Sequence, residues 1–347
     1  MNFGLIGAGQ IGRVRQQALR RASGCQLAAI ADADPARARS LAGSAQAAIC
    51  KDYKELLRRE DVDAVVISTP PDSHEEIAVA ALEAGKHVLC EKPLAPNPEA
   101  CRRMLSAAGK ANRTLSAGFC QRYFPAIQFV KETVTSGAIG ELSYVRAFTG
   151  HAGLSEFSQP WVHDKQVVGG GALMDNGIHM IDLVRHILGD ITEVYGTASA
   201  NVWKFEGSED NGFAMLHTAD GKVAQLQASW TEWRGYRFFI EVYGDRGMAR
   251  ASYAPMFSMA VHLDELGAMR RRRYSLYPRV YVREALQGWT STVRVAFTEE
   301  LQDFARLASG QSTATIADGI AGLRAVEIAH AVYTSSETRQ PVTLAPL

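Results

Sequence analysis

The sequence predicts two domains, a doubly wound α/β domain with a parallel sheet and an α+β domain with a largely antiparallel sheet. Three observations support this prediction. The chain has 347 residues, more than one small core needs. Its first 120 residues alternate apolar, strand-like runs with helical segments. The remainder contains strand-like runs joined by hairpin-like glycine turns. We therefore expect the domains to span residues 1–120 and 121–347.

The strands of the first domain are continuous apolar runs, which is typical of a parallel sheet covered by helices on both faces. They read NFGLIGA, CQLAAIAD, DAVVISTPP, KHVLCE and TLSAGFC. The helices between them read IGRVRQQALRRA, DPARARSLAGSA, SHEEIAVAALEAG and NPEACRRMLSAAGKANR. Asp34 and Pro35 are typical of the start of the second helix.

The second domain is expected to open with a helix at about residues 124–136 and the strand GELSYVRAFTGH. An irregular polar and aromatic stretch follows over 152–171, and then one helix over 172–188. The later strands are EVYGTASANVW, GFAMLHTADGKVAQLQASW and YRFFIEVYGDRGMARASY, with turns at ADGK and GDRG. Two helices close the chain, near 293–308 and 318–335.

Composition argues against several classes of protein. Lys plus Arg is 37 and Asp plus Glu is 37, so nothing favours nucleic acid as a partner. The five cysteines form no close pair, which argues against a disulfide framework and favours a reducing cytoplasm. No apolar run is long enough to cross a bilayer, and the first residues lack a signal core. We expect a cytoplasmic protein without a membrane or nucleic-acid partner.

The turn GAGQIG lies between the first strand and the first helix and has the G-x-G-x-x-G spacing. Gly7 allows the tight turn, Gly9 lets a pyrophosphate approach the backbone, and Gly12 lets helix and strand pack closely. The helix N-terminus, at Gln10 and Ile11, then offers free N–H groups to phosphates. This context predicts a dinucleotide-binding Rossmann domain rather than a tight turn without a ligand.

Asp32 lies twenty residues after Gly12, at the end of the second strand. A carboxylate there accepts hydrogen bonds from the adenine ribose and repels a 2′-phosphate. The pattern therefore favours NAD over NADP. Arg37 and Arg39 lie close by in the sequence, so NADP stays possible, although both arginines also fit an exposed helix face.

The stretches STPPDSH and CEKPL follow two further strands, at the carboxyl ends where such a sheet binds its ligand. A core strand that ends on Glu91 and Lys92 costs desolvation free energy unless something uses the charges. Lys92 is therefore predicted to point into the crevice beside the nicotinamide, and Pro93 makes a cis peptide bond possible. The competing interpretation is a surface lysine. The other expected cofactor contacts here are Ser68, Thr69, Pro70, His74 and Glu91.

The stretch GGGALMDNGIHMIDLVRHIL holds the second candidate group. Asp175 and His179 are four residues apart, so on an α-helix they share a face. An acid beside an imidazole orients the ring, and this arrangement predicts a general base. The glycines 169–171 offer space beside a ligand. A core histidine, or a metal site that adds Asp182 and His186, is the alternative, but one helix face supplies few convergent ligands. We therefore expect no metal.

Further polar and aromatic residues suit the binding of a polyol, because aromatic rings stack on sugar C–H faces. Each of them also fits a structural role. These candidate substrate contacts are Arg122, Tyr123, Trp161, His163 and Asn176, with Asp164 beside them. The run Arg270–Arg273 is interpreted as a solvated edge or loop, with a phosphate-bearing substrate or a subunit contact as alternatives.

Together, GAGQIG, STPPDSH, CEKPL and GGGALMDNGIHMID resemble the motifs of the Gfo/Idh/MocA oxidoreductases, which include glucose–fructose oxidoreductase and inositol dehydrogenase. The resemblance covers essentially the whole chain. It implies that Lys92, Asp175 and His179 line the site where a sugar or cyclitol hydroxyl meets the nicotinamide. It also implies an open antiparallel sheet in the second domain, and with it a homodimer or homotetramer.

The expected reaction is hydride transfer from a carbinol carbon to NAD. His179, oriented by Asp175, is predicted to take the hydroxyl proton while Lys92 stabilises the charge on the same oxygen, or the two exchange roles. Two other functions use the same residues or fold. One is a lyase or glycosidase that oxidises its substrate transiently, and the other is a dinucleotide sensor without catalysis.

Overall fold

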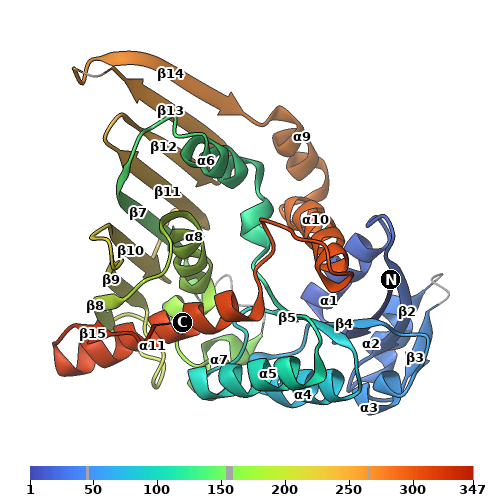
Figure 1. Ribbon diagram of the computed structural model, residues 1–347. Helices are drawn as coiled ribbons and strands as arrows, with labels where there is room; N and C mark the ends of the chain where they lie inside the picture. The colour runs from blue at the N-terminus through green and yellow to red at the C-terminus, as the bar shows by residue number, and fades with distance from the viewer. Residues whose placement is uncertain (44–46, 154–158, 265, 347) are drawn as a thin grey trace. The chain divides into compact units, whose positions relative to one another are not determined.

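A computed structural model describes residues 1–43, 47–153, 159–264 and 266–346 (Figure 1). The chain forms two compact units. The first contains Met1–Tyr123 and Gln287–Leu323, and the second contains Phe124–Leu286 and Arg324–Leu347. The expected division at residue 120 lies close to the first boundary, at residue 123. It did not include the return of the chain to the first unit after residue 286. The expected irregular stretch 152–171 includes 154–158, which lie outside the described residues.

The first unit is built on a six-stranded parallel sheet, as predicted, with the order β3-β2-β1-β4-β5-β6. The order reverses beside β1, so the carboxyl ends of β1 and β4 form the switch point at which sheets of this type bind ligands. The strands are β1 (Asn2–Ile6), β2 (Gln26–Ala31), β3 (Ala48–Cys50), β4 (Ala64–Ile67), β5 (His87–Glu91) and β6 (Leu115–Gly118).

Helices that alternate with these strands begin at residues that suit a helix N-terminus. The side chains of Asp34, Asp52 and Asn97 each accept a backbone N–H of the first turn that follows. Strand β3 and helix α3 were not predicted, because both are too short to give a periodic pattern. The helices are α1 (Gln10–Leu19), α2 (Pro35–Ala42), α3 (Tyr53–Leu57), α4 (His74–Glu83) and α5 (Pro98–Ala111).

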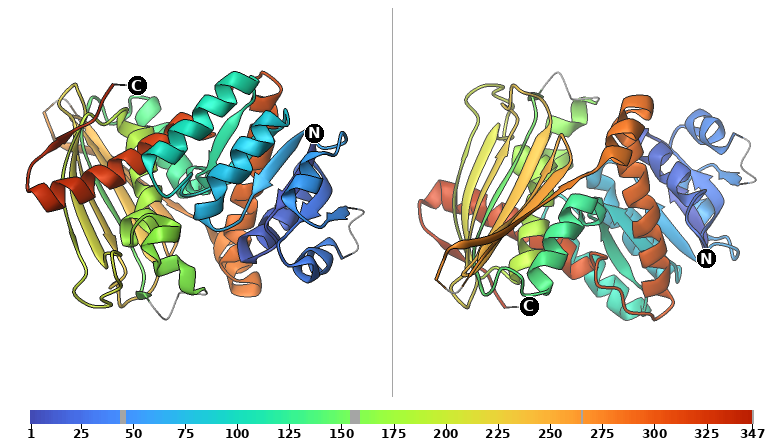
Figure 2. Two further views of the ribbon diagram at one scale, coloured as in Figure 1. Left: turned by 90° about the horizontal axis from the view of Figure 1, so that it is seen from below. Right: turned by 90° about the horizontal axis from the view of Figure 1, so that it is seen from above.

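Helix α10 (Thr290–Ala308) belongs to the first unit although it lies far along the chain. It packs beside α1, as both views in Figure 2 show. Phe304 contacts Phe3 at a ring-centroid distance of 6.0 Å, and the guanidinium of Arg15 lies 3.5 Å from the centre of the Phe297 ring. The burial of these apolar and charged groups holds residues 287–323 in the first unit.

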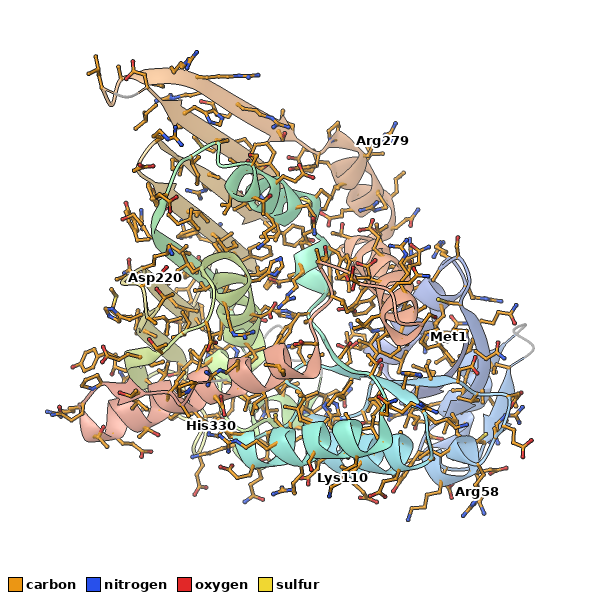
Figure 3. All side chains as sticks on the ribbon, viewed as in Figure 1. Met1, Arg58, Lys110, Asp220, Arg279 and His330 are labelled. Carbon is orange, nitrogen blue, oxygen red and sulfur yellow. The ribbon has the colours of Figure 1, made fainter. Side chains whose placement is uncertain are left out.

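The second unit contains a nine-stranded sheet with the order β14-β13-β12-β11-β7-β10-β9-β8-β15. β7 and β10 pair in parallel and the other pairs run antiparallel, which confirms the predicted sheet type. The turns ADGK and GDRG join β9 to β10 and β11 to β12 as expected, and Figure 3 shows Asp220 at the first of these turns. The strands are β7 (Leu142–Gly150), β8 (Glu193–Ser199), β9 (Asn211–His217), β10 (Val223–Ser229), β11 (Arg237–Gly244), β12 (Gly247–Tyr253), β13 (Phe257–Leu263), β14 (Met269–Leu276) and β15 (Val342–Thr343).

Helices cover one face of this sheet (Figures 1 and 2). α6 (Pro125–Thr135) packs on β12 and β13, and α8 (Ile178–Leu188) packs on β7. The C-terminal part of α11 (Gly319–Thr338) lies against β8, where Ser335 and Ser336 accept the backbone N–H groups of Gly196 and Ala198. The short α7 (Lys165–Val168) and α9 (Pro278–Gln287) complete the helices of this unit.

The arginine run Arg270–Arg273 lies in β14, the edge strand of the sheet, where all four side chains are exposed. The position of the run at an exposed sheet edge agrees with one of the predicted placements, and its role in a subunit contact or at a phosphate-bearing substrate stays a prediction. Charged side chains on an edge strand oppose pairing with a further strand. The guanidinium of Arg273 also lies 4.7 Å from the centre of the Phe129 ring on α6.

Candidate functional site

The glycine-rich turn has the geometry that its three glycines predict. Gly7 has a φ of 98°, and a Cβ there would lie 2.6 Å from the backbone of Ser68. A Cβ on Gly12 would lie 2.0 Å from the carbonyl oxygen of Gly7, so helix and strand pack closely there. At Gly9, by contrast, no described heavy atom lies within 4 Å of the Cβ position. The backbone at Gly9 is therefore open to a ligand.

The N-terminus of α1 and the carboxylate of Asp32 frame this opening. α1 begins at Gln10, and no side chain caps its first N–H groups. Such a terminus suits a phosphate. Asp32 accepts hydrogen bonds from the backbone N–H groups of Ala8, at 2.6 Å, and Asp34, at 2.8 Å. The half-buried carboxylate thus fixes the end of β2 against the glycine turn.

His74 connects the loops that follow β4 and β5. The side chain is fully buried, and its ring nitrogens lie 2.9 Å from the carbonyl oxygen of Thr69 and 3.0 Å from that of Pro93. Burial lowers the pKa of the imidazole, and the two carbonyl oxygens act in the opposite direction. His74 therefore links the loop after β4 to the loop after β5, which are two of the predicted cofactor-binding stretches. Its direct contact with a cofactor stays a prediction.

The stretch Glu91–Pro93 ends β5 with a half-buried lysine between two buried neighbours. The Lys92–Pro93 peptide bond is cis, as the proline allows. Glu91 accepts a hydrogen bond from Nε of Arg15 at 2.5 Å, and Nη1 of Arg15 donates to Glu300 at 2.6 Å. The charge at this strand end is therefore compensated by a guanidinium from α1.

Arg122 and Tyr123, predicted as substrate contacts, lie buried in the 3₁₀ turn Cys120–Tyr123. Nη1 of Arg122 donates to the carbonyl oxygens of Thr315 and Ile316. The hydroxyl of Tyr123 donates to Asp303 on α10 at 3.0 Å. These bonds hold the 287–323 segment within the first unit, which is a structural role.

In the second unit, Asp175 lies in a π-helical turn (Leu173–Gly177) that directly precedes α8. The expected helix over 172–188 is therefore not a uniform α-helix. A π turn is one residue wider than an α turn, so four-residue spacing no longer guarantees a shared face. Such turns occur often at functional sites. The pairing of Asp175 with His179 stays a prediction.

The carboxylate of Asp175 is held by two side chains that the sequence did not suggest. Nε2 of His151 lies 3.1 Å from Oδ2 of Asp175, and Nε1 of Trp230 donates to the same oxygen at 3.1 Å. The backbone N–H of Gly153 donates to Nδ1 of His151, so in neutral His151 the proton lies on Nε2 and points to the carboxylate. His179 is buried one turn further along.

Glu209 holds the start of this helical segment. Its two carboxylate oxygens accept the backbone N–H groups of Gly171 and Leu173, each at 2.7 Å, and the hydroxyl of Tyr333 donates to it at 3.1 Å. Burial raises the pKa of Glu209 to about 7, although the hydrogen bonds act in the opposite direction. The carboxylate satisfies N–H groups that a helix start leaves without partners.

Two glycines of the run 169–171, Gly170 and Gly171, are required by close packing, which is a different role from the predicted space beside a ligand. A Cβ on Gly171 would lie 2.1 Å from the backbone oxygen of Glu209, and a Cβ on Gly170 would lie 2.0 Å from the hydroxyl of Tyr333. Glu209 and Tyr333 can reach the helix start only because these residues lack side chains.

Aromatic contacts lead from Trp230, which donates to Asp175, to His163, one of the predicted substrate contacts. Phe205 packs edge-on against Trp230 at 6.4 Å, and the ring of His163 stacks on Phe205 at 4.0 Å. Trp161 and His163 lie in the 3₁₀ turn Pro160–His163, and Asn176 follows Asp175 directly. Among the described residues, no cluster of His, Cys, Asp or Glu is suited to hold a metal ion.

Two family descriptions match the chain, one for each part. Residues 1–119 match "Oxidoreductase family, NAD-binding Rossmann fold", and residues 127–250 match "GFO/IDH/MocA C-terminal domain". The chain belongs to the Gfo/Idh/MocA oxidoreductases. The resemblance of its motifs to this family and the prediction of NAD as cofactor are thereby confirmed, as is the predicted fold class.

Relatives within the Gfo/Idh/MocA family match over nearly the full length of the chain. Inositol 2-dehydrogenase of Rhizobium meliloti (strain 1021) is 30% identical over 99% of both chains. Inositol 2-dehydrogenase 2 of Saccharopolyspora erythraea is 32% identical over 100% of this chain and 96% of its own. A solved structure of levoglucosan dehydrogenase in complex with NADH and levoglucosan is 26% identical over 99% of both chains, with a TM-score of 0.86. No helix in the described ranges combines the length and apolar character needed to cross a membrane.

We predict that Glu209→Gln lowers the free energy of unfolding by about 1–3 kcal/mol, because the amide nitrogen cannot accept the second backbone N–H and leaves it buried without a partner. Urea unfolding at neutral pH measures the change. Glu206→Gln, an exposed neighbour in the same loop, is the matched control. Equal stability of both variants and the wild type would show that the helix start does not need this carboxylate.

We also predict that Asp32→Ser lowers the KM for NADP and raises the KM for NAD, because the substitution removes both the ribose acceptor and the charge that repels a 2′-phosphate. Steady-state kinetics with both cofactors measure the ratio. Asp34→Ser removes a nearby charge and keeps a helix-capping side chain, so it serves as the control. An unchanged ratio in Asp32→Ser would remove the ribose role.

Proposed function

We propose that this Gfo/Idh/MocA protein is an NAD-dependent dehydrogenase that oxidises a hydroxyl of a sugar or cyclitol. The observation that carries the proposal is the carboxylate of Asp175, which His151 and Trp230 orient on the turn before His179. The relatives named inositol 2-dehydrogenase and levoglucosan dehydrogenase act on polyhydroxylated substrates by their names, which supports this substrate class.

The residues of the first unit fit a bound dinucleotide. The uncapped start of α1 and the open backbone at Gly9 suit a pyrophosphate, and the half-buried Asp32 suits a ribose. NAD, when bound, supplies the acceptor for the hydride that leaves the carbinol carbon. The stretches at Ser68–Pro70 and Glu91–Lys92 follow neighbouring strands at the same edge of the sheet.

In this proposal, His179 accepts the proton that the substrate hydroxyl loses as the hydride leaves. Lys92 donates a hydrogen bond to the same oxygen and stabilises its developing negative charge. Asp175 orients the imidazole and stabilises its protonated form. Two donors already fix the Asp175 carboxylate, so little reorganisation remains when the proton moves. Lys92 and His179 could also exchange these roles.

The aromatic rings around Asp175 favour a substrate with apolar C–H faces between its hydroxyl groups. The rings of Trp161 and His163 are partly exposed, and Phe205 supports His163 from behind. Stacking of this kind suits a pyranose or a cyclitol. Asn176 offers an amide for a neighbouring hydroxyl. We assign Arg122 and Tyr123 a supporting role, because their hydrogen bonds join segments of the first unit.

We further propose that a second copy of this chain covers the open face of the nine-stranded sheet. That face carries Tyr144, Tyr195, Phe213 and Met215, which are each 39–49% exposed although they lie within strands. Tyr144 stacks on Tyr243 at 4.4 Å, so the apolar surface is continuous across β7 and β11. The same face holds Glu241, which forms ion pairs with Arg146 and Arg250. In a two-fold symmetric dimer, charges of one copy can face opposite charges of the other copy.

A screen of polyols, aldoses and inositols for NAD reduction tests the proposed activity. Net accumulation of NADH with one of these compounds supports a dehydrogenase. A lyase or glycosidase with transient oxidation would consume its substrate without accumulating NADH, and a sensor would bind the cofactor without turnover.

With the substrate found in this way, we predict that His179→Ala and Lys92→Met each lower kcat by about a hundredfold or more. Each removes a group that acts on the reacting oxygen, so KM for NAD should change far less. His330→Ala, on α11 (Figure 3), is the control for loss of an imidazole in the same unit. Near-full turnover of His179→Ala would remove the proposed base.

For the second copy, we predict that the double variant Phe213→Lys, Met215→Lys is monomeric in light scattering at micromolar concentration, whereas the wild type is a dimer or tetramer. Lysine at these positions places charge in the centre of the contact. Gln311→Lys adds charge at an exposed position of the first unit and should leave the assembly intact. A monomeric wild type would contradict the proposal.

A further inference from the structure

The imidazole of His74, the first residue of α4, is fully buried between two loops of the first unit. One loop follows β4 and contains Thr69, and the other follows β5 and contains Lys92 and Pro93. Nε2 of His74 lies 2.9 Å from the carbonyl oxygen of Thr69, and Nδ1 lies 3.0 Å from the carbonyl oxygen of Pro93. These two contacts are called here the His74 clasp. Because β4 and β5 pair in parallel, both loops leave the same edge of the sheet.

The loop after β4 packs directly on the glycine-rich turn. A Cβ on Gly7 would lie 2.6 Å from the carbonyl group of Ser68 and 2.9 Å from the backbone nitrogen of Thr69. The hydroxyl of Ser73 supports the same loop, with its oxygen 2.7 Å from Oγ1 of Thr69 and 2.8 Å from the carbonyl oxygen of Pro70. This side of the clasp is therefore a fixed support beside the turn at which a dinucleotide is expected.

The loop after β5 carries the candidate catalytic amine. Pro93 directly follows Lys92, so the carbonyl group that His74 contacts is one residue away from the lysine. Lys92 is half-buried, whereas Pro93 and Leu94 are buried. A bond that fixes the carbonyl group of Pro93 also fixes the backbone from which the Lys92 side chain starts.

We propose that His74 is a positioning residue for Lys92, which it holds through the Pro93 carbonyl group at a set distance from the loop on the cofactor turn. A displacement near 1 Å between reacting groups lowers a rate by up to about a hundredfold, so a buried cross-link at this point affects the chemistry. The catalytic meaning of the clasp rests on the function proposed above, whereas the clasp itself does not.

The number of protons on the ring decides how many hydrogen bonds the His74 clasp contains. Both partners are carbonyl oxygens, which only accept, and a neutral imidazole has one N–H. A neutral ring therefore donates to one loop, and a protonated ring donates to both. Burial lowers the pKa of His74, and the carbonyl oxygens and the charge of Glu91 act in the opposite direction. Both bonds form as the pH falls through this pKa, and one is lost as the pH rises through it.

The acidic groups on the elements around His74 are exposed or have partners of their own. Glu91 pairs with Arg15, Glu75 with Arg103 of α5 and Glu76 with the hydroxyl of Tyr53 at the start of α3, and Asp72 is exposed. Lys92 adds a positive charge beside Pro93. Because several charges lie in this region, a test of the clasp has to follow protonation of the His74 ring itself together with the two loops.

Two amide variants separate the two bonds. The amide nitrogen of asparagine is as many bonds from Cβ as Nδ1 of histidine, and that of glutamine as many as Nε2. His74→Asn therefore keeps a donor for Pro93, and His74→Gln keeps a donor for Thr69. In His74→Gln, deuterium exchange of the amides in residues 90–97 should be about fivefold or more faster, the effect of one lost hydrogen bond. In His74→Asn it should stay close to the wild-type rate.

His87→Gln is the matched control. His87 begins β5, at the opposite end of the strand from Lys92, and its Nδ1 accepts the backbone N–H of Thr114. Its replacement should leave exchange in residues 90–97 unchanged. Equal exchange in His74→Gln, His74→Asn and the wild type would overturn the proposal. The same acceleration in both amide variants would assign the effect to lost packing and would overturn it as well.

The wild type alone provides a second decision if the variants do not fold. Exchange of the ring C2 proton, measured by peptide mass spectrometry, follows the protonation of His74. After correction for the intrinsic pH dependence of amide exchange, protection of residues 67–72 or 90–97 should fall as the pH rises through the His74 midpoint. The part of α5 around Lys110 should show no such step (Figure 3). Constant protection of both loops across the midpoint would refute the clasp.

Steady-state kinetics test the positioning of Lys92 once a substrate is known. In His74→Gln, kcat should fall by about tenfold to a hundredfold, while KM for NAD changes far less, and in His74→Asn kcat should fall far less. The exchange measurements need no substrate, so a failure of the proposed dehydrogenase activity is distinguished from a failure of the clasp. A fall in NAD affinity with kcat unchanged in His74→Gln would assign His74 to the cofactor and overturn its role at Lys92.

Discussion

A buried guanidinium needs carboxylates in place of water, and this requirement organises the first unit. Arg15 is fully buried, and it obtains its partners from the end of β5 and from α10. To provide Glu300, the chain must return to the first unit after it has built most of the second. The same ion pairs join the helix of the cofactor turn to the strand end at Lys92. One buried charge thus connects the cofactor region, the candidate catalytic amine and the route of the chain.

The second unit uses a buried carboxylate in a related way. Glu209 satisfies backbone N–H groups at the start of the segment that carries Asp175 and His179, and glycines make room for it. His151 and Trp230 then fix the carboxylate of Asp175. In both units, therefore, candidate catalytic side chains lie on backbone that buried polar groups hold. Burial places the pKa of one carboxyl in each unit, Glu209 and Glu300, at about 7.

Local patterns predicted the parallel sheet and the roles of Gly7 and Gly12, and Pro93 made a cis bond possible, because each of these features depends on residues close together in the sequence. Patterns failed where the signal is short or polar, as in β3 and in the arginine strand β14. Partners such as His151 and Trp230 directly follow β7 and β10, far from Asp175 in the sequence, so no spacing reveals them. A signal for the buried ion pairs of Arg15 with Glu91 and Glu300 was present in the sequence. Arg15 and Glu300 interrupt apolar helix stripes, and a charge in such a stripe indicates a buried partner.

The discontinuous first unit has a consequence for biosynthesis. The amino-terminal sheet leaves the ribosome early, yet the segment 287–323, with Glu300 and Phe304, emerges only after nearly the whole second unit. Until then the guanidinium on the first helix lacks one of its two counter-ions, and an apolar surface around Phe3 stays uncovered. Domains commonly fold in order during translation. Here the nascent dinucleotide-binding part must wait, in an incomplete state, for a late-arriving helix to finish it.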